Sequence, residues 1–211
     1  MSEILGVLFA LLVGMLSVPK LMGYQQASND NSIAATTAEQ QKIFNAAVTA
    51  YIKQYATSIE GTATSTSPFV ISVPTLQMPA VNLLPASFGS INPYGQTWQA
   101  EVLQPTPGNL TALSLSIGGT PIKDKQAGKI ASLVGAIGGM IPQNDSTIYP
   151  SGTAMAMGSA SGWTESTANF TGITPGTLAS LIMFDQGQLV SPYLYRNAVP
   201  GQPQLNTMAP T

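Results

Sequence analysis

Hydrophobic and polar residues divide the chain into three stretches of different character, the first of which is almost purely apolar. Residues 4–19 read ILGVLFALLVGMLSVP without a charged side chain, between Glu3 on one side and Lys20 on the other. As a helix rising about 1.5 Å per residue this run is roughly 24 Å long, somewhat short of the ~30 Å hydrocarbon core of a bilayer. We therefore predict a lipid-compatible anchor helix over residues 1–24, in which the Lys20 side chain reaches the membrane surface.

A cleaved secretory signal is the alternative for this first stretch. Signal peptides carry Lys or Arg ahead of the apolar run and a small-x-small cleavage site behind it. Here the only charge ahead of the run is acidic, and Ser17-Val18-Pro19-Lys20 offers no such site. A lone carboxylate at the head of a buried apolar helix needs a cationic partner. We expect Glu3 to find it in the N-terminal ammonium of a neighbouring chain.

The second stretch, residues 25–57, is polar at first and amphipathic afterwards. Proline removes an intrahelical hydrogen bond and glycine disfavours helix, so Pro19, Gly23 and the polar run up to residue 32 predict a weakened or melted segment. One of residues 30–32 then caps a new helix. Within this helix apolar residues recur at spacings of three and four and predict one buried face: Ile43, Phe44, Ala47, Val48, Tyr51, Ile52 and Tyr55.

Short apolar runs between Pro- and Gly-rich turns characterise the third stretch, residues 58–211, and predict β-strands. The expected strands are residues 69–73, 97–103, 110–117, 178–184 and 189–195. Residues 122–141 predict a helix, with Lys123, Lys125 and Lys129 on its polar side and Gly138-Gly139 at its end. The predicted fold class is α+β: a long N-terminal hydrophobic and amphipathic helix packed as a spine on a mainly antiparallel β head.

Composition argues against most catalytic and binding chemistries. Cysteine and histidine are absent, which excludes a disulfide, a thiolate site and the commonest general base and metal ligand. The nine Asp and Glu residues are widely spaced and indicate solvated surface charge rather than a catalytic pair. Seven basic residues without a dense cluster argue against nucleic acid as a partner. We expect no catalytic, metal-binding or cofactor-binding residues.

Two tryptophans and three glycines have alternative interpretations. Trp98 and Trp163 are more often buried packing residues than platforms for a sugar ring, and glycan binding is the alternative. Gly135, Gly138 and Gly139 do not form a phosphate-binding loop, because no Gly-Lys-Ser/Thr follows a strand there. We interpret these three glycines as helix-end residues.

The N-terminal stretch resembles the start of type IV pilins. In that family an apolar helix carries one glutamate near its start and often a proline about two-thirds of the way along, and Glu3 and Pro19 match both features. Such helices bundle as the core of a filament, so the resemblance implies assembly through Glu3, Pro19 and the leucines Leu5, Leu8 and Leu12. Pilins are made with a short basic leader before the mature start, whereas Met1 stands only two residues ahead of Glu3. Either a leader is missing from this sequence or its match to the pilin pattern is incomplete.

Several further motifs resemble the constant N-terminal part of the shufflon PilV-type proteins, minor pilins of conjugative type IVb pili. They follow one another in order over nearly the whole chain: Asn45-Ala46-Ala47-Val48-Thr49-Ala50-Tyr51-Ile52, Tyr94-Gly95-Gln96, Gln99-Ala100-Glu101-Val102, Gly118-Gly119-Thr120-Pro121, Gly138-Gly139-Met140-Ile141, Leu194-Tyr195-Arg196 and Pro203-Gln204-Leu205-Asn206-Thr207-Met208. The resemblance implies a structural pilin that is anchored in the inner membrane before assembly, meets the pilus assembly machinery, and then forms a helical homo-oligomer outside the cell.

A tip subunit is the alternative that this resemblance implies. As an adhesin it would bind a receptor on a recipient or host cell during conjugation or attachment. Members of the family continue into a repeat-rich stalk and a variable adhesive tip, whereas this sequence stops at Thr211. We therefore expect a shaft-forming role rather than an adhesive one.

Overall fold

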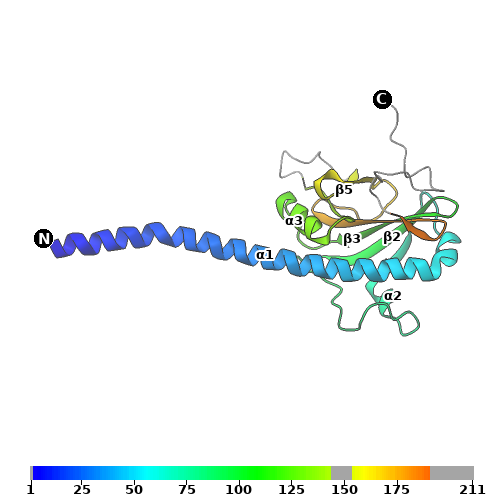
Figure 1. The fold of residues 1–211 in the computed structure, drawn as a ribbon, viewed down its shortest axis with the longest axis horizontal. Helices are drawn as coiled ribbons and strands as arrows, with labels where there is room; N and C mark the ends of the chain where they lie inside the picture. The colour runs from blue at the N-terminus through cyan, green and yellow to red at the C-terminus, as the bar shows by residue number, and fades with distance from the viewer. Residues whose placement is uncertain (1, 144–153, 191–211) are drawn as a thin grey trace, which may run out of the picture.

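The computed structural model describes residues 2–143 and 154–190, with side chains from Tyr24 onwards. One helix, α1 (Ser2–Glu60), extends as a long rod from a compact head, and its C-terminal half lies along the sheet of that head (Figure 1). This arrangement confirms the α+β fold class with an N-terminal helix packed on an antiparallel sheet. Within the part of the chain that the structure describes, we find no helix whose length and apolar character would let it cross a membrane.

The described strands form a single eight-stranded sheet in which every pair is antiparallel. Its order is β1-β2-β3-β7-β4-β5-β6, and β8 pairs with β7 beyond the end of β4. The strands are β1 (Phe69–Ser72), β2 (Thr97–Thr106), β3 (Asn109–Ile117), β4 (Gly138–Ile141), β5 (Met155–Gly158), β6 (Thr164–Ser166), β7 (Thr177–Asp185) and β8 (Gln188–Val190). The shorter helices are α2 (Val73–Gln77), α3 (Asp124–Val134) and the single turn η1 (Ser159–Ser161).

The predicted break in the N-terminal helix is wrong. α1 is continuous through Pro19, Gly23 and the polar run, and the one residue inside it with non-helical backbone angles is Tyr55. A proline fixes φ near a helical value and removes a single hydrogen bond, so its neighbours keep the helix intact. Contacts with the head support the polar run, because Gln126 Nε2 donates to the Asp30 carbonyl at 2.7 Å. The stretches predicted as 1–24 and 25–57 therefore form one helix.

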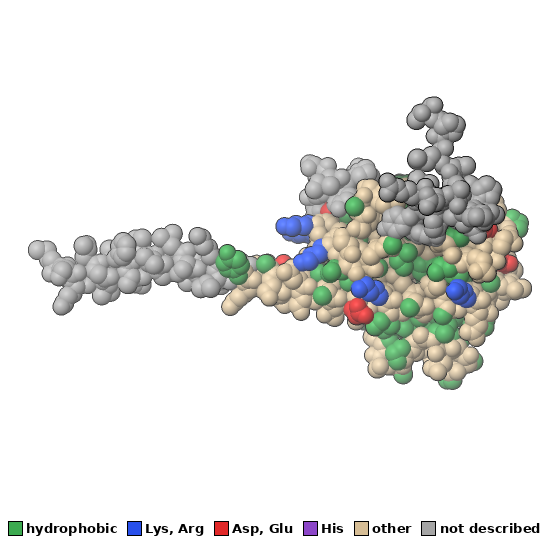
Figure 2. Space-filling model, in the orientation of Figure 1, with side chains coloured by type: hydrophobic (Ala, Val, Ile, Leu, Met, Phe, Trp, Pro, Cys, Tyr) green, Lys and Arg blue, Asp and Glu red, His purple; other side chains and the backbone are tan. Residues whose placement is uncertain are grey.

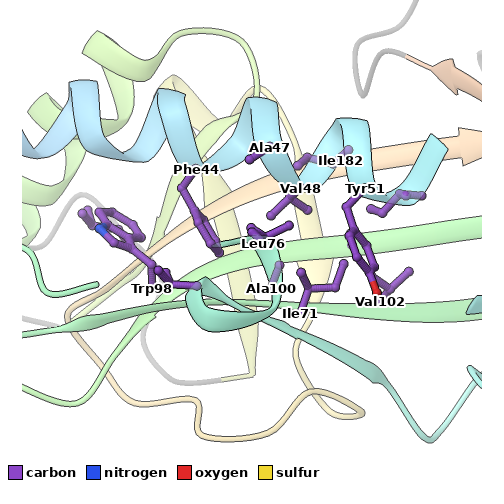
Figure 3. Packing of buried hydrophobic residues seen from close by; sticks show 14 of the residues in the cluster. Phe44, Ala47, Val48, Tyr51, Ile71, Leu76, Trp98, Ala100, Val102 and Ile182 are labelled. Carbon is purple, nitrogen blue, oxygen red and sulfur yellow. The ribbon is translucent and has the colours of Figure 1, made fainter. Parts of the chain in front are cut away.

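The amphipathic face of α1 packs on one side of the sheet, and most of the predicted buried face is confirmed. Phe44 and Val48 are fully buried against strand residues such as Trp98, Ala100, Val102 and Ile182 (Figure 3). Ile52 is fully buried in the same cluster. Ile43 is an exception at 41% exposed, because it lies one position before Phe44 on the solvent side of the helix. A second apolar cluster covers the opposite face of the sheet: Leu103, Leu113, Leu115, Ile141, Ala156, Trp163, Phe170, Ala179 and Leu181. The alternation of side chains along each strand separates the two cores.

The helix predicted over residues 122–141 is wrong in its second half. α3 ends at Val134, and Gly135 takes a φ of +100° that suits glycine. Residues 138–141 form β4 instead, a buried strand between β7 and β5. A Cβ on Gly138 would lie 2.3 Å from the Ala131 carbonyl oxygen. The glycines of β4 therefore permit close packing and do not end a helix.

The other strand predictions agree with the structure within a few residues. β1 ends at Ser72 because Ser72 Oγ accepts a hydrogen bond from Thr75 N and caps α2. β2 and β3 extend the predicted runs and pair in a hairpin. Of the last predicted strand, β8 covers only the beginning, and residues 191–195 lie outside the described residues.

Candidate assembly interface

The projecting part of α1, residues 2–25, is the first candidate interface. At about 1.5 Å per residue these 24 positions extend roughly 36 Å, and Figure 1 shows them leading away from the head. Near the head the helix is open to solvent, since Tyr24 is 75% exposed. A helix that leads away from its own head leaves its surface free for other molecules.

All five residues predicted to act in assembly lie on this projecting part. Leu5, Leu8 and Leu12 share one face of the helix by their spacing of three and four, and Pro19 follows seven residues after Leu12. Glu3 lies one residue after the start of α1. Their side chains lie outside the described residues, so their assembly role stays a prediction.

The junction between α1 and the head is held by polar contacts from α3. Lys129 Nζ donates to Asn31 Oδ1, and Gln126 reaches the Asp30 carbonyl. The predicted polar side of α3 is confirmed by Lys123 and Lys125, which are exposed. A groove of 560 Å³ follows the junction, lined by Gln26, Ala27, Asp30, Asn31, Ile33, Tyr94, Thr120, Pro121, Ile122, Lys123, Lys125, Gln126 and Lys129.

The surroundings of Tyr94 at this junction shift the pKa of its phenol. Burial raises the pKa of its phenol, a hydrogen bond from Gln126 lowers it, and the Asp30 carboxylate raises it further. The net pKa lies above the ordinary value of 10.0. Tyr94 therefore stays neutral near neutral pH and acts as a packing and hydrogen-bonding group.

The part of α1 that lies on the sheet makes polar contacts that the sequence did not indicate. Gln41 Nε2 donates to the Ala179 carbonyl at 3.0 Å and to Ser180 Oγ at 2.9 Å, and Asn45 Nδ2 donates to the same hydroxyl at 2.9 Å. Gln41, Asn45 and Ser180 are all buried. These directional bonds fix the register of the helix on β7, which apolar contacts alone would leave free to slide.

A second groove lies between α1 and the end of α3. We call it the α1–α3 groove: it has a volume of 440 Å³ and is lined by Lys42, Asn45, Ala46, Thr49, Ala50, Lys53, Val134 and Ile137. Figure 2 shows the head as a surface on which charged side chains are few and scattered. The motif of residues 45–52 contributes four of the eight lining residues, so this motif builds both the core face and the groove.

Two other motifs, Tyr94-Gly95-Gln96 and Gly118-Gly119-Thr120-Pro121, meet at one buried side chain, Gln96. Its Nε2 donates to the carbonyls of Thr120 at 3.1 Å and Gly176 at 2.9 Å, while its Oε1 accepts the Ser116 hydroxyl at 2.6 Å. Asn92 supports the same turn, because its Oδ1 accepts from the backbone nitrogen of Gln96 at 3.0 Å. Gln96 thus joins segments that are distant in sequence into one end of the sheet.

The glycines beside Gln96 allow two turns of the chain to pack closely against each other. A Cβ on Gly119 would lie 2.5 Å from the carbonyl carbon of Gly95, and both residues have positive φ. Thr120 N donates to the Tyr94 carbonyl at 2.9 Å across the same contact. The Tyr94-Gly95-Gln96 and Gly118-Gly119-Thr120 motifs are therefore two sides of one packed turn.

The interpretation of all carboxylates as surface charge is wrong for Glu101 and Asp124, which are fully buried. Glu101 lies on β2 and accepts hydrogen bonds from the backbone N–H and the hydroxyl of Thr171 and from Gln99 Nε2. Asp124 Oδ1 accepts from Gln143 N at 2.6 Å. Each carboxylate holds a loop against a strand or a helix. An isolated acidic residue in the sequence does not indicate such a role.

The packing role of both tryptophans is confirmed. Trp98 stacks on Phe44 of α1 with ring centroids 6.0 Å apart. Trp163 lies over β4 and β5, where a Cβ on Gly139 or Gly158 would come within 2.5 Å of the indole. Both rings are buried, at 1% and 6% exposed, so neither offers a face to a sugar.

Comparison with known proteins agrees with these motifs. The family model described as bacterial shufflon protein, N-terminal constant region, matches residues 29–211. A search of curated proteins found no match, and neither did a search of solved structures. The matched range contains the docked half of α1, the Gln96 turn and the whole sheet. This chain therefore belongs to the bacterial shufflon protein family and contains its N-terminal constant region.

Proposed function

We propose that this chain is a non-enzymatic structural subunit of an extracellular type IV-like pilus and that it polymerises through α1. The observation that carries the proposal is the projecting part of α1, a roughly 36 Å helix that leaves the head without a break and contains the uncharged residues 4–19. Membership of the shufflon family supports association with a pilus. A head with two packed cores and a free helix is suited to a filament whose helices form the centre.

Cohesion of the filament comes chiefly from apolar packing of the projecting helices. Leu5, Leu8 and Leu12 pack against copies of themselves, and each such side chain when fully buried contributes roughly 1.5–3 kcal/mol relative to exposure in water. Before assembly the same residues lie in the inner membrane, so the net gain per subunit is smaller and depends on close packing. Gly6 and Gly14 leave room for neighbouring backbones.

Glu3 acts as the polar contact in this apolar bundle. An unpaired buried carboxylate is strongly destabilising, by about 3–5 kcal/mol when its partner is removed, so the N-terminal ammonium of an incoming subunit neutralises it. Pro19 lies at the boundary where the apolar helix approaches the polar run. The pilus assembly machinery moves the subunit from the membrane into the filament.

A tip subunit is the second candidate, and the family description favours it because a constant region implies a variable one elsewhere in such proteins. In that role the chain binds a receptor on a recipient or host cell. The two roles differ in copy number. Quantifying the chain in sheared filaments separates them, because thousands of copies per filament indicate the shaft and a few indicate the tip.

The Glu3→Ala variant tests assembly directly. We expect its filament yield to fall while the head remains folded, because Glu3 lies on the projecting helix, far along the chain from both cores. Leu5→Ala is a companion that removes apolar area without touching the charge. Filaments of wild-type yield from both variants would overturn the proposal that α1 drives assembly.

A further inference from the structure

We propose that the lysines around the groove at the junction of α1 and the head bind the anionic headgroups of a membrane surface while the projecting part of α1 lies in the bilayer. The inference rests on the proposed function and adds the lipid chemistry that the head contacts before assembly. We call this 560 Å³ groove the junction groove. The inference follows from the charge of the groove, from the direction of α3, and from the distance between the groove and the apolar run.

The junction groove carries a net positive charge. Its lining includes Lys123, Lys125 and Lys129, whereas Asp30 is the one acidic residue in that lining. The chain as a whole has seven basic and nine acidic residues, so the groove differs in sign from the rest of the protein. Lys123 and Lys125 are exposed and form no ion pair with any residue that the structure describes. An anionic partner therefore complements this surface, and a basic partner would be repelled.

The direction of α3 places these charges at the end of the head from which α1 projects. Gln126 in the first turn of α3 contacts the Asp30 carbonyl, whereas Val134 at the end of α3 lines a groove with residues 42–53 of α1. α3 therefore runs in the same direction as α1, and its N-terminus faces the projecting part. Figure 2 shows basic side chains at this end of the head. The partial positive charge of a helix N-terminus adds to that of the lysines.

The junction groove begins close to the end of the apolar run. The run ends at Pro19, and the first residue of α1 that lines the groove is Gln26. Because α1 is continuous, these seven positions correspond to roughly 10 Å. The headgroup region on each side of a ~30 Å hydrocarbon core is about 5–8 Å thick. With residues 4–19 in the hydrocarbon, the groove lies beside the headgroups, within reach of long lysine side chains.

The two contacts with lipid do different things. The apolar run sets how deeply the chain enters the bilayer but leaves the head free to rotate about the axis of α1. Each lysine held near an anionic surface strengthens binding roughly fivefold, so three on one side of the head favour one orientation. The lysines therefore hold α3 towards the membrane and leave the opposite end of the head exposed.

Acetylation of the lysines tests the contact. The whole chain is added to vesicles of phosphatidylcholine, or of phosphatidylcholine and phosphatidylglycerol in equal parts, and the vesicles are floated to isolate the bound chain. Peptide mass spectrometry then follows each lysine. We expect acetylation of Lys123, Lys125 and Lys129 to be at least about fivefold slower on the anionic vesicles. Lys53, exposed on α1 outside the junction groove, reacts equally on both, and about 1 M salt removes the difference because it shortens the screening length.

Two double variants give a matched comparison. One combines Lys123→Gln with Lys125→Gln, and the other combines Lys42→Gln with Lys53→Gln, which removes the same charge from exposed positions of α1. We expect the anionic vesicles to protect Lys129 in the second variant and not in the first. Equal protection of Lys129 in both variants would overturn the inference.

Other outcomes identify a different occupant. Protection on phosphatidylcholine vesicles after inorganic phosphate is added would show a site for a free anion and overturn the lipid contact. Protection on those vesicles that rises with the number of chains per vesicle would show an acidic surface of a second copy instead. A chain that floats with both kinds of vesicle but reacts equally on them contradicts this inference alone. A chain that floats with neither contradicts the membrane stage of the proposed function, and the inference with it.

Discussion

The Glu101 carboxylate accepts the backbone N–H of Thr171 at 2.7 Å, across 70 residues of sequence. Glu101 is fully buried on β2, and it also accepts hydrogen bonds from the Thr171 hydroxyl and from Gln99 Nε2. A buried charge is tolerated when several donors satisfy it. The pair attaches the loop between β6 and β7 to β2, the second strand from one edge of the sheet.

Glu101→Gln tests this attachment. The amide has one acceptor oxygen where the carboxylate has two, so one donor on Thr171 or Gln99 loses its partner. We expect the free energy of unfolding to fall by about 1–3 kcal/mol, measured by urea denaturation of the full chain. Gln54→Glu, at an exposed position of α1, controls for the change between amide and acid and leaves stability within about 0.5 kcal/mol of wild type. An unchanged urea midpoint for Glu101→Gln would show that the contact contributes nothing.

Gly119→Ala and Gly118→Ala form a matched pair in adjacent positions. Both residues have positive φ, and either alanine meets the backbone strain of about 1 kcal/mol that this region imposes on side chains. Only at Gly119 would the new Cβ also collide with backbone, 2.5 Å from the Gly95 carbonyl carbon, while Gly118 has open space. We expect Gly119→Ala to lower the melting temperature clearly more than Gly118→Ala. Equal shifts would contradict the close contact of the two turns.

The pH dependence of stability reports on Glu165. Burial raises the pKa of its carboxyl above 4.5, so the folded state holds a proton that the unfolded state has already released. Stability contributed by this group is present below pH 4.5 and is lost as pH rises through the folded pKa. Glu165→Gln cannot ionise, so its melting temperature relative to wild type should increase as the pH rises from about 4 towards neutrality. A difference that is constant over this range would contradict the shift.

The junction contacts set how firmly α1 is held where it leaves the head. Removing the hydrogen bond from Gln126 to the Asp30 carbonyl, 2.7 Å long, loses about 1 kcal/mol, roughly fivefold in a local opening equilibrium. We expect Gln126→Ala to speed amide hydrogen exchange in α1 around Ile33 and to leave exchange in β3 unchanged. Lys125→Ala removes an exposed side chain of the same helix and serves as the control, with wild-type exchange at both places. Wild-type exchange around Ile33 in Gln126→Ala would show that this hydrogen bond does not hold the junction.

Local patterns in the sequence determined those helices and strands whose apolar residues recur at regular short spacings. The three-and-four spacing around Phe44 and Val48 predicted the docked face of α1, and the apolar runs around Leu113 and Leu181 predicted β3 and β7. Burial on one face of a helix or on a strand leaves such a periodicity regardless of the partner. The apolar run of residues 4–19 likewise marked the part of α1 that projects.

Only the tertiary structure decided those features that depend on contacts with residues far away in the sequence. Gly138 and Gly139 lie in a strand that pairs with β7, at positions where Ala131 and Trp163 leave no room for a side chain. The buried Glu101 is satisfied by donors on Thr171. The break expected after Pro19 is absent, and the polar contacts of Gln126 and Lys129 support the helix beyond it. Local propensities are worth less than about 1 kcal/mol per ordinary residue, so a few contacts between distant segments outweigh them.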